Sequence, residues 1–532
     1  MTVNPEFAAR APQEIVHSDL NASYDFIVCG SGSSGSVVAG RLAENPNATV
    51  LLLEAGNVDK APSHREVGAW PMNIGTASDW GFRSQPEPFL NGRSVALSMG
   101  KVLGGGSSIN VMIWARGHKS DWDFFAAEVG DPAWNYESVL SIYRRIEDWH
   151  GAPDPEYRGS GGMVFVQPEP DPHPIALATL AAARSIGIPT FENQNGKMME
   201  SEGGASIIDL RARNGKRQSS FRSYVFPFMD RANLTVWPNA VVTRVTFEGK
   251  RATGVEILFD GKTHRIAAKS EVVLSLGAIH TPKVLMQSGI GDETELQRFG
   301  IPIVQNLPGV GRNFQDHVGF DCVWEAKEAL APRNNFVEAT IFWKSDPKLD
   351  VPDLQICHGE FLKASPENMT RFQPPASSWT LFGGLERPHS RGRVRLTGPQ
   401  PGNPIQIEAN FLSDPEDRKA AIACVELCRE IGNSAPLKPF AQREIMPGNL
   451  KGAELENYIR DAASTYWHQT GTAKMGRDSM SVVDGELRVY GVENLRIADG
   501  SIMPRVTTGN TMAPCFIIGE RAAEILRTKY KL

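Results

Sequence analysis

The chain has 532 residues, of which 41% are hydrophobic and 22% are charged, and its formal net charge is −6. This length exceeds what one hydrophobic core supports, so we expect two domains or a large composite fold. The negative charge disfavours nucleic acid and anionic membranes as partners. No run of about 18 apolar residues occurs, so no transmembrane segment is expected.

Two features predict where the protein resides. The first twenty residues contain no apolar core segment, so we expect no secretory signal. Their charged or titratable residues are Glu6, Arg10, Glu14, His17 and Asp19. The six cysteines are scattered along the chain, which favours buried free thiols over a disulfide framework. We therefore expect a cytoplasmic protein.

Residues 24–56 predict a βαβ unit with a glycine-rich turn. An apolar run, Phe26 to Cys29, leads into the turn, and a small-residue helix and a second strand, Thr49 to Leu53, follow it. Glycines permit a tight turn and close approach to a pyrophosphate, while the helix N-terminus offers free N–H groups. The candidate cofactor residues of this turn are Gly30, Gly32, Ser33, Ser34 and Gly35.

An acidic residue, Glu54, ends the second strand and is followed by Ala55. Its carboxylate is placed to accept hydrogen bonds from the ribose hydroxyls of an adenosine. A glycine-rich turn that merely packs a helix on a sheet is the alternative. The strand before the turn, the helix after it and the acid at the end of the next strand together favour a dinucleotide site, to which we assign Glu54 and Ala55.

Irregular structure is predicted next, for residues 57–99. Gly100 to Asn110 then forms a glycine-serine loop that enters a helical segment. Small residues let the backbone pass close to a planar ring, although a flexible surface loop has the same composition. A helix is expected near Ile175 to Ile186.

The middle of the chain predicts two β-rich regions. Residues 233–275 alternate apolar and polar positions in short runs, which indicates a β-meander that returns to the first sheet. Residues 318–445 contain further strand signals, among them 392–396 and 404–408. A helix near Glu416 to Gly432 follows them.

The last seventy residues return to βα character. Residues 493–503 predict a strand that runs into a turn, and residues 510–526 predict a helix with an apolar face. No second glycine fingerprint follows a strand anywhere in the sequence. A flavin reductase would use a second one to bind NAD(P)H, so the sequence disfavours that class of enzyme.

Cys424 and Cys428 lie four residues apart on the predicted helix, a spacing that half of a metal site could use. No second pair of cysteines or histidines stands at ligand spacing. The sequence therefore favours core packing for this pair, and no metal site is expected.

Several blocks of the sequence, in order, resemble the signatures of the glucose–methanol–choline (GMC) family of flavoprotein oxidoreductases. The glycine turn with Glu54 is the first of them. The others are Gly100 to Asp123, Gly277 to Gly291, Leu307 to His317, Tyr466 to Gly476 and Leu495 to Pro514. The resemblance covers the chain from about Tyr24 to its end.

This resemblance implies an α/β fold of two domains. A Rossmann-like FAD-binding domain is expected from residues 24–165, 206–317 and 461–532. An α+β substrate domain, with a β-sheet and flanking helices, is expected from residues 166–205 and 318–460.

The resemblance also implies FAD as the cofactor, held without a covalent bond. Some members attach the flavin through a histidine just before the signature asparagine, and Ile109 occupies that place here. Asn110 is expected near the reactive edge of the flavin. Val242 would hold the adenine through its backbone, although a buried strand valine accounts for it equally well. The candidates implied for cofactor binding are Gly105, Ser107, Asn110, Val242, Asp499, Gly500, Asn510 and Thr511.

His468 occupies the position at which members of the family carry their catalytic histidine. Alcohol oxidation removes a hydroxyl proton as a hydride leaves the same carbon, and histidine exchanges protons near neutral pH. Asn510, where members carry histidine or asparagine, is expected to bind the substrate oxygen. A satisfied core histidine and a turn asparagine are the alternatives. His317 is equally consistent with a structural and a catalytic role.

The activity implied is oxidation of a neutral, primary alcohol to an aldehyde, or of an alcohol to a ketone, by hydride transfer to flavin N5. Either O2 or another electron acceptor would reoxidise the flavin, and the oligomeric state is left open. Choline-oxidising members carry a glutamate shortly after the Gln-Asp-His motif, where this chain has Val318 and Gly319. The alternatives are a flavin lyase resembling hydroxynitrile lyases and a catalytically silent FAD-binding protein.

Overall fold

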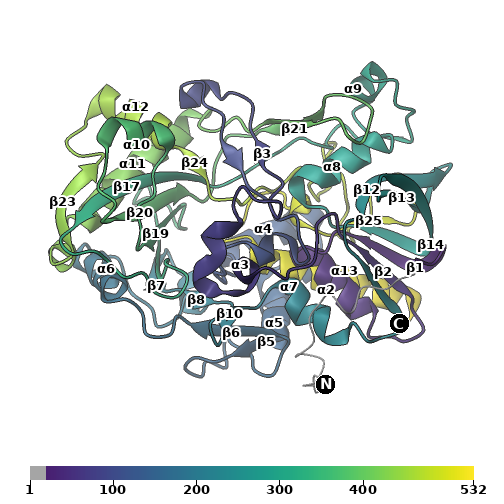
Figure 1. Cartoon of the computed structure of the whole chain (residues 1–532), viewed down its shortest axis with the longest axis horizontal. Helices are drawn as coiled ribbons and strands as arrows, with labels where there is room; N and C mark the ends of the chain where they lie inside the picture. The colour runs from purple at the N-terminus through teal and green to yellow at the C-terminus, as the bar shows by residue number, and fades with distance from the viewer. Residues whose placement is uncertain (1–19) are drawn as a thin grey trace.

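A computed structural model describes residues 20–532, so the expectation for the N-terminal segment lies outside the described residues. The molecule has two lobes side by side, and each is built on one large sheet (Figure 1). Strands β1, β2 and β14 lie on the right of this view, and β17, β20 and β23 lie on the left. Among the described residues, no helix is both long and apolar enough to cross a membrane.

The first sheet has seven strands, in the order β11-β2-β1-β14-β13-β12, with β25 also beside β14. Neighbours in its centre run parallel, and β12, β13 and β14 form the antiparallel meander that the sequence predicted. The central strands are continuous apolar runs because helices and loops cover both faces. The strands are β1 (Ser23–Cys29), β2 (Val50–Leu53), β11 (Leu234–Trp237), β12 (Val241–Glu248), β13 (Arg251–Phe259), β14 (Lys262–Leu274) and β25 (Leu495–Ile497).

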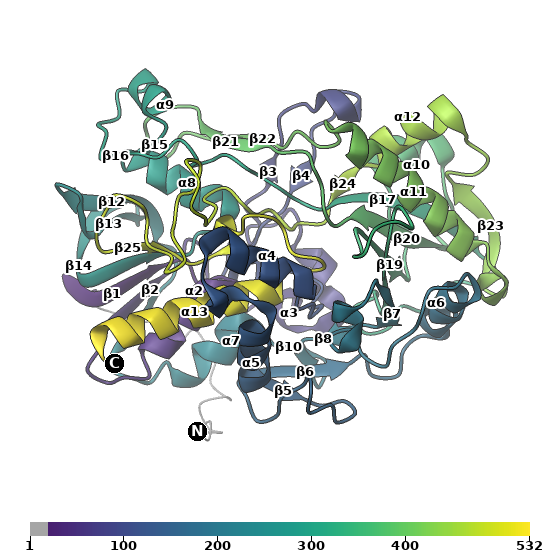
Figure 2. The same cartoon turned by 180° about the vertical axis from the view of Figure 1, so that it is seen from behind.

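Two helices from opposite ends of the chain pack together on this sheet, α2 (Ser33–Leu42) and α13 (Met512–Tyr530). Figure 2 shows α13 running alongside α2. The hydroxyl of Ser34 donates to the Cys515 carbonyl at 2.7 Å. Gly519 permits this close approach, because a Cβ there would lie 2.8 Å from the Ser34 carbonyl oxygen. The first domain is therefore closed by its most distant segments.

The second sheet is antiparallel, in the order β23-β17-β20-β19-β18-β7, with β24 also beside β17. Its strands are β7 (Gly204–Ile207), β17 (Val318–Ala326), β18 (Ala339–Trp343), β19 (Leu354–Gly359), β20 (Ser378–Leu385), β23 (Ala441–Met446) and β24 (Ser464–Thr465). Its flanking helices are α6 (Pro174–Ser185), α10 (Pro366–Phe372), α11 (Pro415–Gly432) and α12 (Gly452–Ala462). A Rossmann-like sheet joined to an α+β lobe confirms the predicted α/β fold class.

Cys424 and Cys428 of α11 pack into the core against the second sheet. A Cβ on Gly383 of β20 would lie 2.6 Å from the Cys424 sulfur and 2.8 Å from the Cys428 sulfur. The helix therefore presses its two thiols onto a position that only glycine leaves open.

Two predicted domain boundaries meet strands of the second sheet. β7 continues past residue 205 to Ile207 and pairs with β18, and β24 lies past residue 460 and pairs with β17. Hydrogen bonding assigns both strands to the second sheet, so we propose boundaries after residues 207 and 465. The five-segment division stays a proposal.

Shorter elements connect the two sheets and cover their ends. The helices are α3 (Pro62–Arg65), α4 (Lys119–Val129), α5 (Tyr136–Ile146), α7 (Ser220–Tyr224), α8 (Gly277–Gln287) and α9 (Glu293–Arg298). The strands are β3 (Phe82–Arg83), β4 (Ala96–Leu97), β5 (Glu147–Trp149), β6 (Val164–Pro168), β8 (Asp209–Leu210), β9 (Ala212–Arg213), β10 (Lys216–Arg217), β15 (Ile290–Gly291), β16 (Gln305–Asn306), β21 (Arg393–Leu396) and β22 (Ile405–Glu408).

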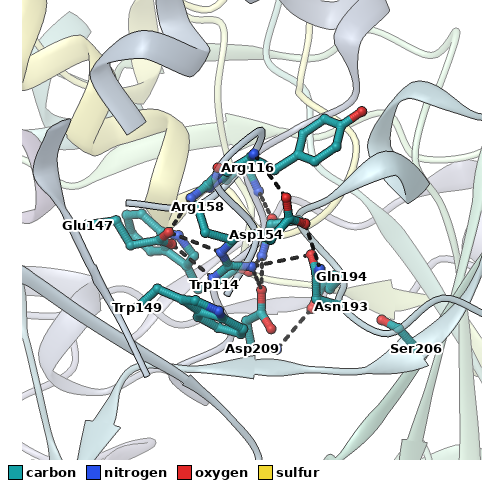
Figure 3. Close-up of polar contacts among 12 residues, drawn as sticks. Trp114, Arg116, Glu147, Trp149, Asp154, Arg158, Asn193, Gln194, Ser206 and Asp209 are labelled. Atoms are coloured by element: carbon teal, nitrogen blue, oxygen red, sulfur yellow. Dashed lines mark hydrogen bonds and ion pairs between the residues drawn. The ribbon is translucent and has the colours of Figure 1, made fainter. Parts of the chain in front are cut away.

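A buried network of charges fixes the segment that follows the glycine-serine loop (Figure 3). Arg158 donates to Glu147 at 2.9 Å and to Asp209 at 2.6 Å. Arg116 pairs with the same Glu147 at 2.6 Å, and its backbone N–H donates to Asn195. Two guanidinium groups thus face two carboxylates, which is the pairing that buried charges need. The network therefore joins Arg116 to Glu147 of the predicted FAD-binding domain and to Asn195 of the predicted substrate domain.

Candidate active site and cofactor cavity

One continuous cavity reaches from the first sheet to the second. Its cofactor end is lined by Glu54 and Val242, and its substrate end by Cys357 and Phe382. Both predicted catalytic residues and all but two of the predicted cofactor residues lie on its wall. The predicted residues on the wall are Gly30, Gly32, Ser33, Ser34, Glu54, Ala55, Gly105, Asn110, Val242, His468, Asp499, Gly500, Asn510 and Thr511.

The three glycines of the turn have different tasks. Gly30 has φ of +97°, and a Cβ there would lie 2.3 Å from the Ser275 carbonyl oxygen. A Cβ on Gly35 would lie 1.9 Å from the Gly30 carbonyl oxygen, so Gly35 serves helix–strand packing and does not line the cavity. A Cβ on Gly32 would meet nothing within 4 Å. Gly32 alone of the three therefore offers bare backbone to open space.

Ser107 is the second predicted cofactor residue that does not line the cavity. Its hydroxyl donates to the Gly104 carbonyl at 2.6 Å and contacts the Ser220 hydroxyl at 3.0 Å. It therefore holds the glycine-serine loop from behind. The loop itself packs on the glycine turn, because a Cβ on Gly105 would lie 2.8 Å from the Cα of Gly32.

The cofactor end combines a free helix start with a buried carboxylate. Helix α2 begins after Gly32 without a side-chain cap, so its first N–H groups are not bonded by one. Glu54 accepts hydrogen bonds from the backbone and hydroxyl of Ser31, at 3.1 and 2.7 Å, and from the Gly56 backbone at 2.8 Å. Burial raises the pKa of Glu54, and these hydrogen bonds partly oppose that shift. They hold the carboxylate rigidly on the wall.

Polar groups also line the middle of the cavity. Asn110 accepts a hydrogen bond at 2.7 Å from Arg217, a buried guanidinium whose pKa is lowered by burial to about 9. Asp499 accepts from the backbone of Gly277 at 2.9 Å and from the hydroxyl of Thr281 at 2.6 Å. Burial raises the pKa of Asp499. These bonds fix Asn110 and Asp499, two of the side chains that the sequence predicted to bind the cofactor.

The residues present fit FAD. The cavity is long enough to contact both sheets, and one part of it offers open backbone at Gly32, an uncapped helix start and a carboxylate. Helix α13 also begins at the wall without a side-chain cap, next to Thr511. Buried polar atoms without protein partners, the Asn510 Oδ1 and the Thr470 hydroxyl, belong to residues that line the same space.

His468 is the centre of a buried hydrogen-bond chain. Its side chain is only 7% exposed. Nε2 lies 3.2 Å from the Asn510 amide nitrogen, and Nδ1 lies 2.8 Å from Nδ1 of His317. Burial and the neighbouring His317 lower the pKa of His468 well below its usual value near 6.5. With its proton on Nδ1, the neutral ring presents the Nε2 lone pair toward Asn510.

A second histidine and a carboxyl stand behind His468. Nδ1 of His317 lies 3.3 Å from Glu386, which accepts a hydrogen bond from the Gly509 backbone. Burial lowers the pKa of His317 to about 3 and raises that of Glu386 well above its usual value. Burial thus disfavours the charged form of both groups, a protonated His317 and an ionised Glu386.

The loop that bears His468 is held in a strained conformation. Trp467, directly before it, has φ of +62°, which is rare for a bulky residue. Asp316 fixes the loop by accepting from the His468 backbone at 2.8 Å and from the Gln469 amide at 2.8 Å. Burial raises the pKa of Asp316 to about 7. Such over-determined strain is typical of functional sites.

Sequence reasoning missed several residues of the site. The sequence left the adjacent pair Asp316 and His317 open between a structural and a catalytic role, and it did not predict that Asp316 fixes the loop of His468. Glu386 gave no signal, because only the hydrogen bonding of β20 and the 509 turn brings it to His317. Lys363 and Phe382, which line the substrate end, were equally silent in the sequence.

Comparison with known proteins gives concordant matches. Two family models described as GMC oxidoreductase match residues 24–319 and 388–519. A GMC-type oxidoreductase of Mycobacterium tuberculosis is 37% identical, covering 96% of this chain and all of that protein. The mitochondrial choline dehydrogenase of Homo sapiens is 34% identical, covering 96% and 91%. The crystal structure of pyridoxine 4-oxidase from Mesorbium loti has a TM-score of 0.90 and 30% identity, covering 94% and 98%.

Proposed function

The chain belongs to the GMC oxidoreductase family, and from that premise we propose that it oxidises a neutral primary alcohol to an aldehyde. The family binds FAD, and its members act on alcohol-type substrates. The observation that supports the proposal is the buried pair of His468 and Asn510 on the wall of the cavity. An acceptor for the hydroxyl proton and a donor for the oxygen thus stand side by side.

The chain's own residues hold the cofactor and the reacting alcohol. Gly32, Asn110 and Thr511 lie on the wall where FAD would bind. When bound, FAD supplies the hydride acceptor at its N5 atom. Asn510 donates its amide N–H to the alcohol oxygen and so orients the carbinol carbon. Nε2 of His468 accepts the hydroxyl proton.

The lowered pKa of His468 keeps the ring in its proton-accepting form and also makes it a weaker base. Burial favours the neutral ring, so Nε2 keeps its lone pair at neutral pH and below. His317 holds the ring through the Nδ1 contact and is itself neutral. We assign His317 the role of positioning residue, since it reaches the reacting atoms only through His468.

The substrate end disfavours a quaternary ammonium such as choline. A buried cation needs a carboxylate or aromatic faces directed at it. Gly319 stands where choline-oxidising relatives carry glutamate, and the ring of Phe382 fills its space, 2.3 Å from a Cβ built there. No carboxylate therefore enters at this position. The relatives named for choline and for pyridoxine represent two kinds of alcohol substrate that the activity screen must compare.

Further parts of the proposal concern the cofactor and its surroundings. We expect FAD to dissociate on acid denaturation, because Ile109 lines the cavity and has no group that could bond to the flavin. Yellow colour that stays with the acid-precipitated protein would contradict this. Either O2 or another acceptor serves as oxidant, and the six free cysteines favour a cytoplasmic location.

An anaerobic screen tests the activity. Purified holoenzyme is mixed with benzyl alcohol, hexanol, a hydroxymethyl heteroarene and choline, and loss of the flavin absorbance is followed. Bleaching by a neutral alcohol supports the proposal, and repetition in air with peroxide detection identifies the oxidant. Cleavage of a cyanohydrin without bleaching would indicate a lyase. Flavin content with neither reaction would indicate a silent FAD-binding protein.

A further inference from the structure

A lysine stands among mostly apolar side chains on the wall of the substrate end. Lys363 lies between β19 and α10, and its backbone N–H donates to the Thr380 hydroxyl of β20 at 3.0 Å. Its side chain is 23% exposed and lines the cavity. Nearby wall residues are Trp70, Ile113, Val337, Phe361 and Phe382. Among the described residues of this wall, the Lys363 ammonium is the one cationic group that could contact a substrate.

The ammonium is held in place by one carboxylate. Nζ of Lys363 lies 2.7 Å from Oδ1 of Asp321, which is 1% exposed and lies on β17. An ammonium has three N–H donors, and this bond uses one of them. Nζ also lies 3.6 Å from the ring centroid of Phe382. Donors therefore remain for a group inside the cavity.

Stacked rings connect this lysine with the catalytic histidine. Phe382 stacks on Tyr466, with ring centroids 4.1 Å apart and an interplanar angle of 17°. The Tyr466 ring lies 5.8 Å from that of His468. Lys363 and His468 thus lie at opposite ends of a two-ring stack.

Two glycines of the second sheet make room for this stack. A Cβ on Gly319 would lie 2.3 Å from the Phe382 ring, and a Cβ on Gly384 would lie 2.3 Å from the Tyr466 ring. The Tyr466 hydroxyl donates to the Phe382 carbonyl, which fixes one ring relative to the other. The distance from Lys363 to His468 is therefore set by rigid parts of the sheet.

We propose that Lys363 is a specificity-determining residue that binds an acidic oxygen, a carboxylate or a phenol, at the end of an aryl alcohol away from its carbinol. The reaction in this statement rests on the proposed function, and the anchor adds to its neutral alcohols those that carry an acidic group away from the carbinol. The apolar wall accepts the ring, Lys363 supplies a charge-assisted hydrogen bond, and His468 receives the hydroxyl at the other end. The same ammonium repels choline.

Binding of a ligand that carries no alcohol tests the anchor alone. The holoenzyme is titrated with 4-methylbenzoate, and the perturbation of the flavin absorbance gives the dissociation constant. We expect Lys363→Met to weaken binding about 10- to 100-fold, as for loss of a hydrogen bond to a charged group. Lys363→Arg keeps the charge and should restore most of the affinity. Equal affinity in wild type and Lys363→Met would overturn the proposal.

Controls separate the anchor from a structural ion pair. Lys419→Met removes an exposed lysine that also pairs with a carboxylate at 2.7 Å, and it should leave the affinity unchanged. If Lys363→Met fails to fold because Asp321 is left unpaired, the double variant Asp321→Asn/Lys363→Met removes both charges together. That folded variant should also bind 4-methylbenzoate weakly, and unchanged binding by it would refute the anchor.

Turnover supplies the second readout. The ratio of kcat/KM for 4-(hydroxymethyl)benzoate over benzyl alcohol should fall about 10- to 100-fold in Lys363→Met, while kcat/KM for benzyl alcohol changes little. A ratio that stays constant would contradict the proposal. If no alcohol is oxidised but 4-methylbenzoate binding depends on Lys363, the proposed function fails and the anchor stands.

Discussion

The two ends of the cavity are built in different ways. The cofactor end is made of turns, helix starts and strand ends, and much of its wall is backbone near Gly32, Glu54 and Gly105. The substrate end is made of side chains, among them Lys363, Phe382 and His468, from strands and loops far apart in the chain. The cofactor end is thus specified by local sequence, and the substrate end by how strands pair in the second sheet.

This difference separates binding from chemistry. In the proposed function, the cofactor end would supply N–H groups and a carboxylate to parts of FAD that do not react, and so would contribute equally to the ground state and the transition state. The substrate end holds the proposed catalytic pair, with Nε2 of His468 3.2 Å from the amide nitrogen of Asn510. Substitutions at the two ends should therefore change different measured quantities, and four experiments can break or sharpen this division.

The largest effect is expected at His468. His468→Ala removes the proton acceptor, so the rate constant of anaerobic flavin reduction should fall about 10²- to 10⁴-fold. FAD content should stay that of wild type, because His468 adds no group to the cofactor end. Stopped-flow absorbance measures the rate constant.

A matched control uses His389, a histidine of the second domain that does not line the cavity. His389 is exposed, and only its backbone is hydrogen-bonded to Asp417. His389→Ala should reduce the flavin at the wild-type rate. A wild-type rate in His468→Ala would remove the catalytic assignment altogether.

Two glycine substitutions come next. Gly35→Ala brings a Cβ to 1.9 Å from a backbone carbonyl oxygen, so it should destabilise the fold by roughly 1–3 kcal/mol, as overpacking does. Gly32→Ala points into open space and should leave the Tm of the apoprotein unchanged while FAD binds more weakly. Thermal unfolding with and without FAD measures both. Equal loss of apoprotein stability in the two variants would show that Gly32 also serves packing.

The contrast between the two ends also explains how much the sequence could predict. The glycine turn, Glu54 and the 233–275 meander follow from short-range patterns, and the structure contains them where expected. The roles of Gly35 and Ser107 behind the cavity wall were not predicted, because one motif serves both packing and binding. Glu386 and Lys363 could not be predicted, because their partners His317 and Asp321 are set by strand pairing.

The third experiment alters the carboxylate of the cofactor end. Glu54→Ala should weaken FAD binding about tenfold or more, the scale of lost hydrogen bonds to a charged group. The reduction rate of the reconstituted holoenzyme should stay within about twofold of wild type, since the lost binding is shared by both states. Ultrafiltration gives the FAD affinity. The affinity of Glu54→Gln should lie between those of wild type and Glu54→Ala. A large fall in the rate constant would show that the cofactor end also contributes to the chemical step.

The smallest effect is expected from pH. In the proposed function the base is the neutral form of His468, and a lowered pKa keeps that form as the pH falls. The reduction rate should therefore change less than about twofold between pH 8 and pH 6, whereas a histidine of pKa about 6.5 would lose about three quarters of its base form. Stopped flow in overlapping buffers measures the profile. A decline centred near pH 6.5 would show that His468 titrates as an exposed histidine.

The packing of α13 on α2 has a consequence for folding. Ser34 bonds to Cys515, which lies 481 positions later in the chain, and β25 joins the first sheet from the same late segment. During synthesis the glycine turn leaves the ribosome long before the helix that packs on it. Closing so distant a contact is slow. Because Thr511 and the start of α13 line the cavity, a ligand bound there stabilises only chains whose last segment has docked.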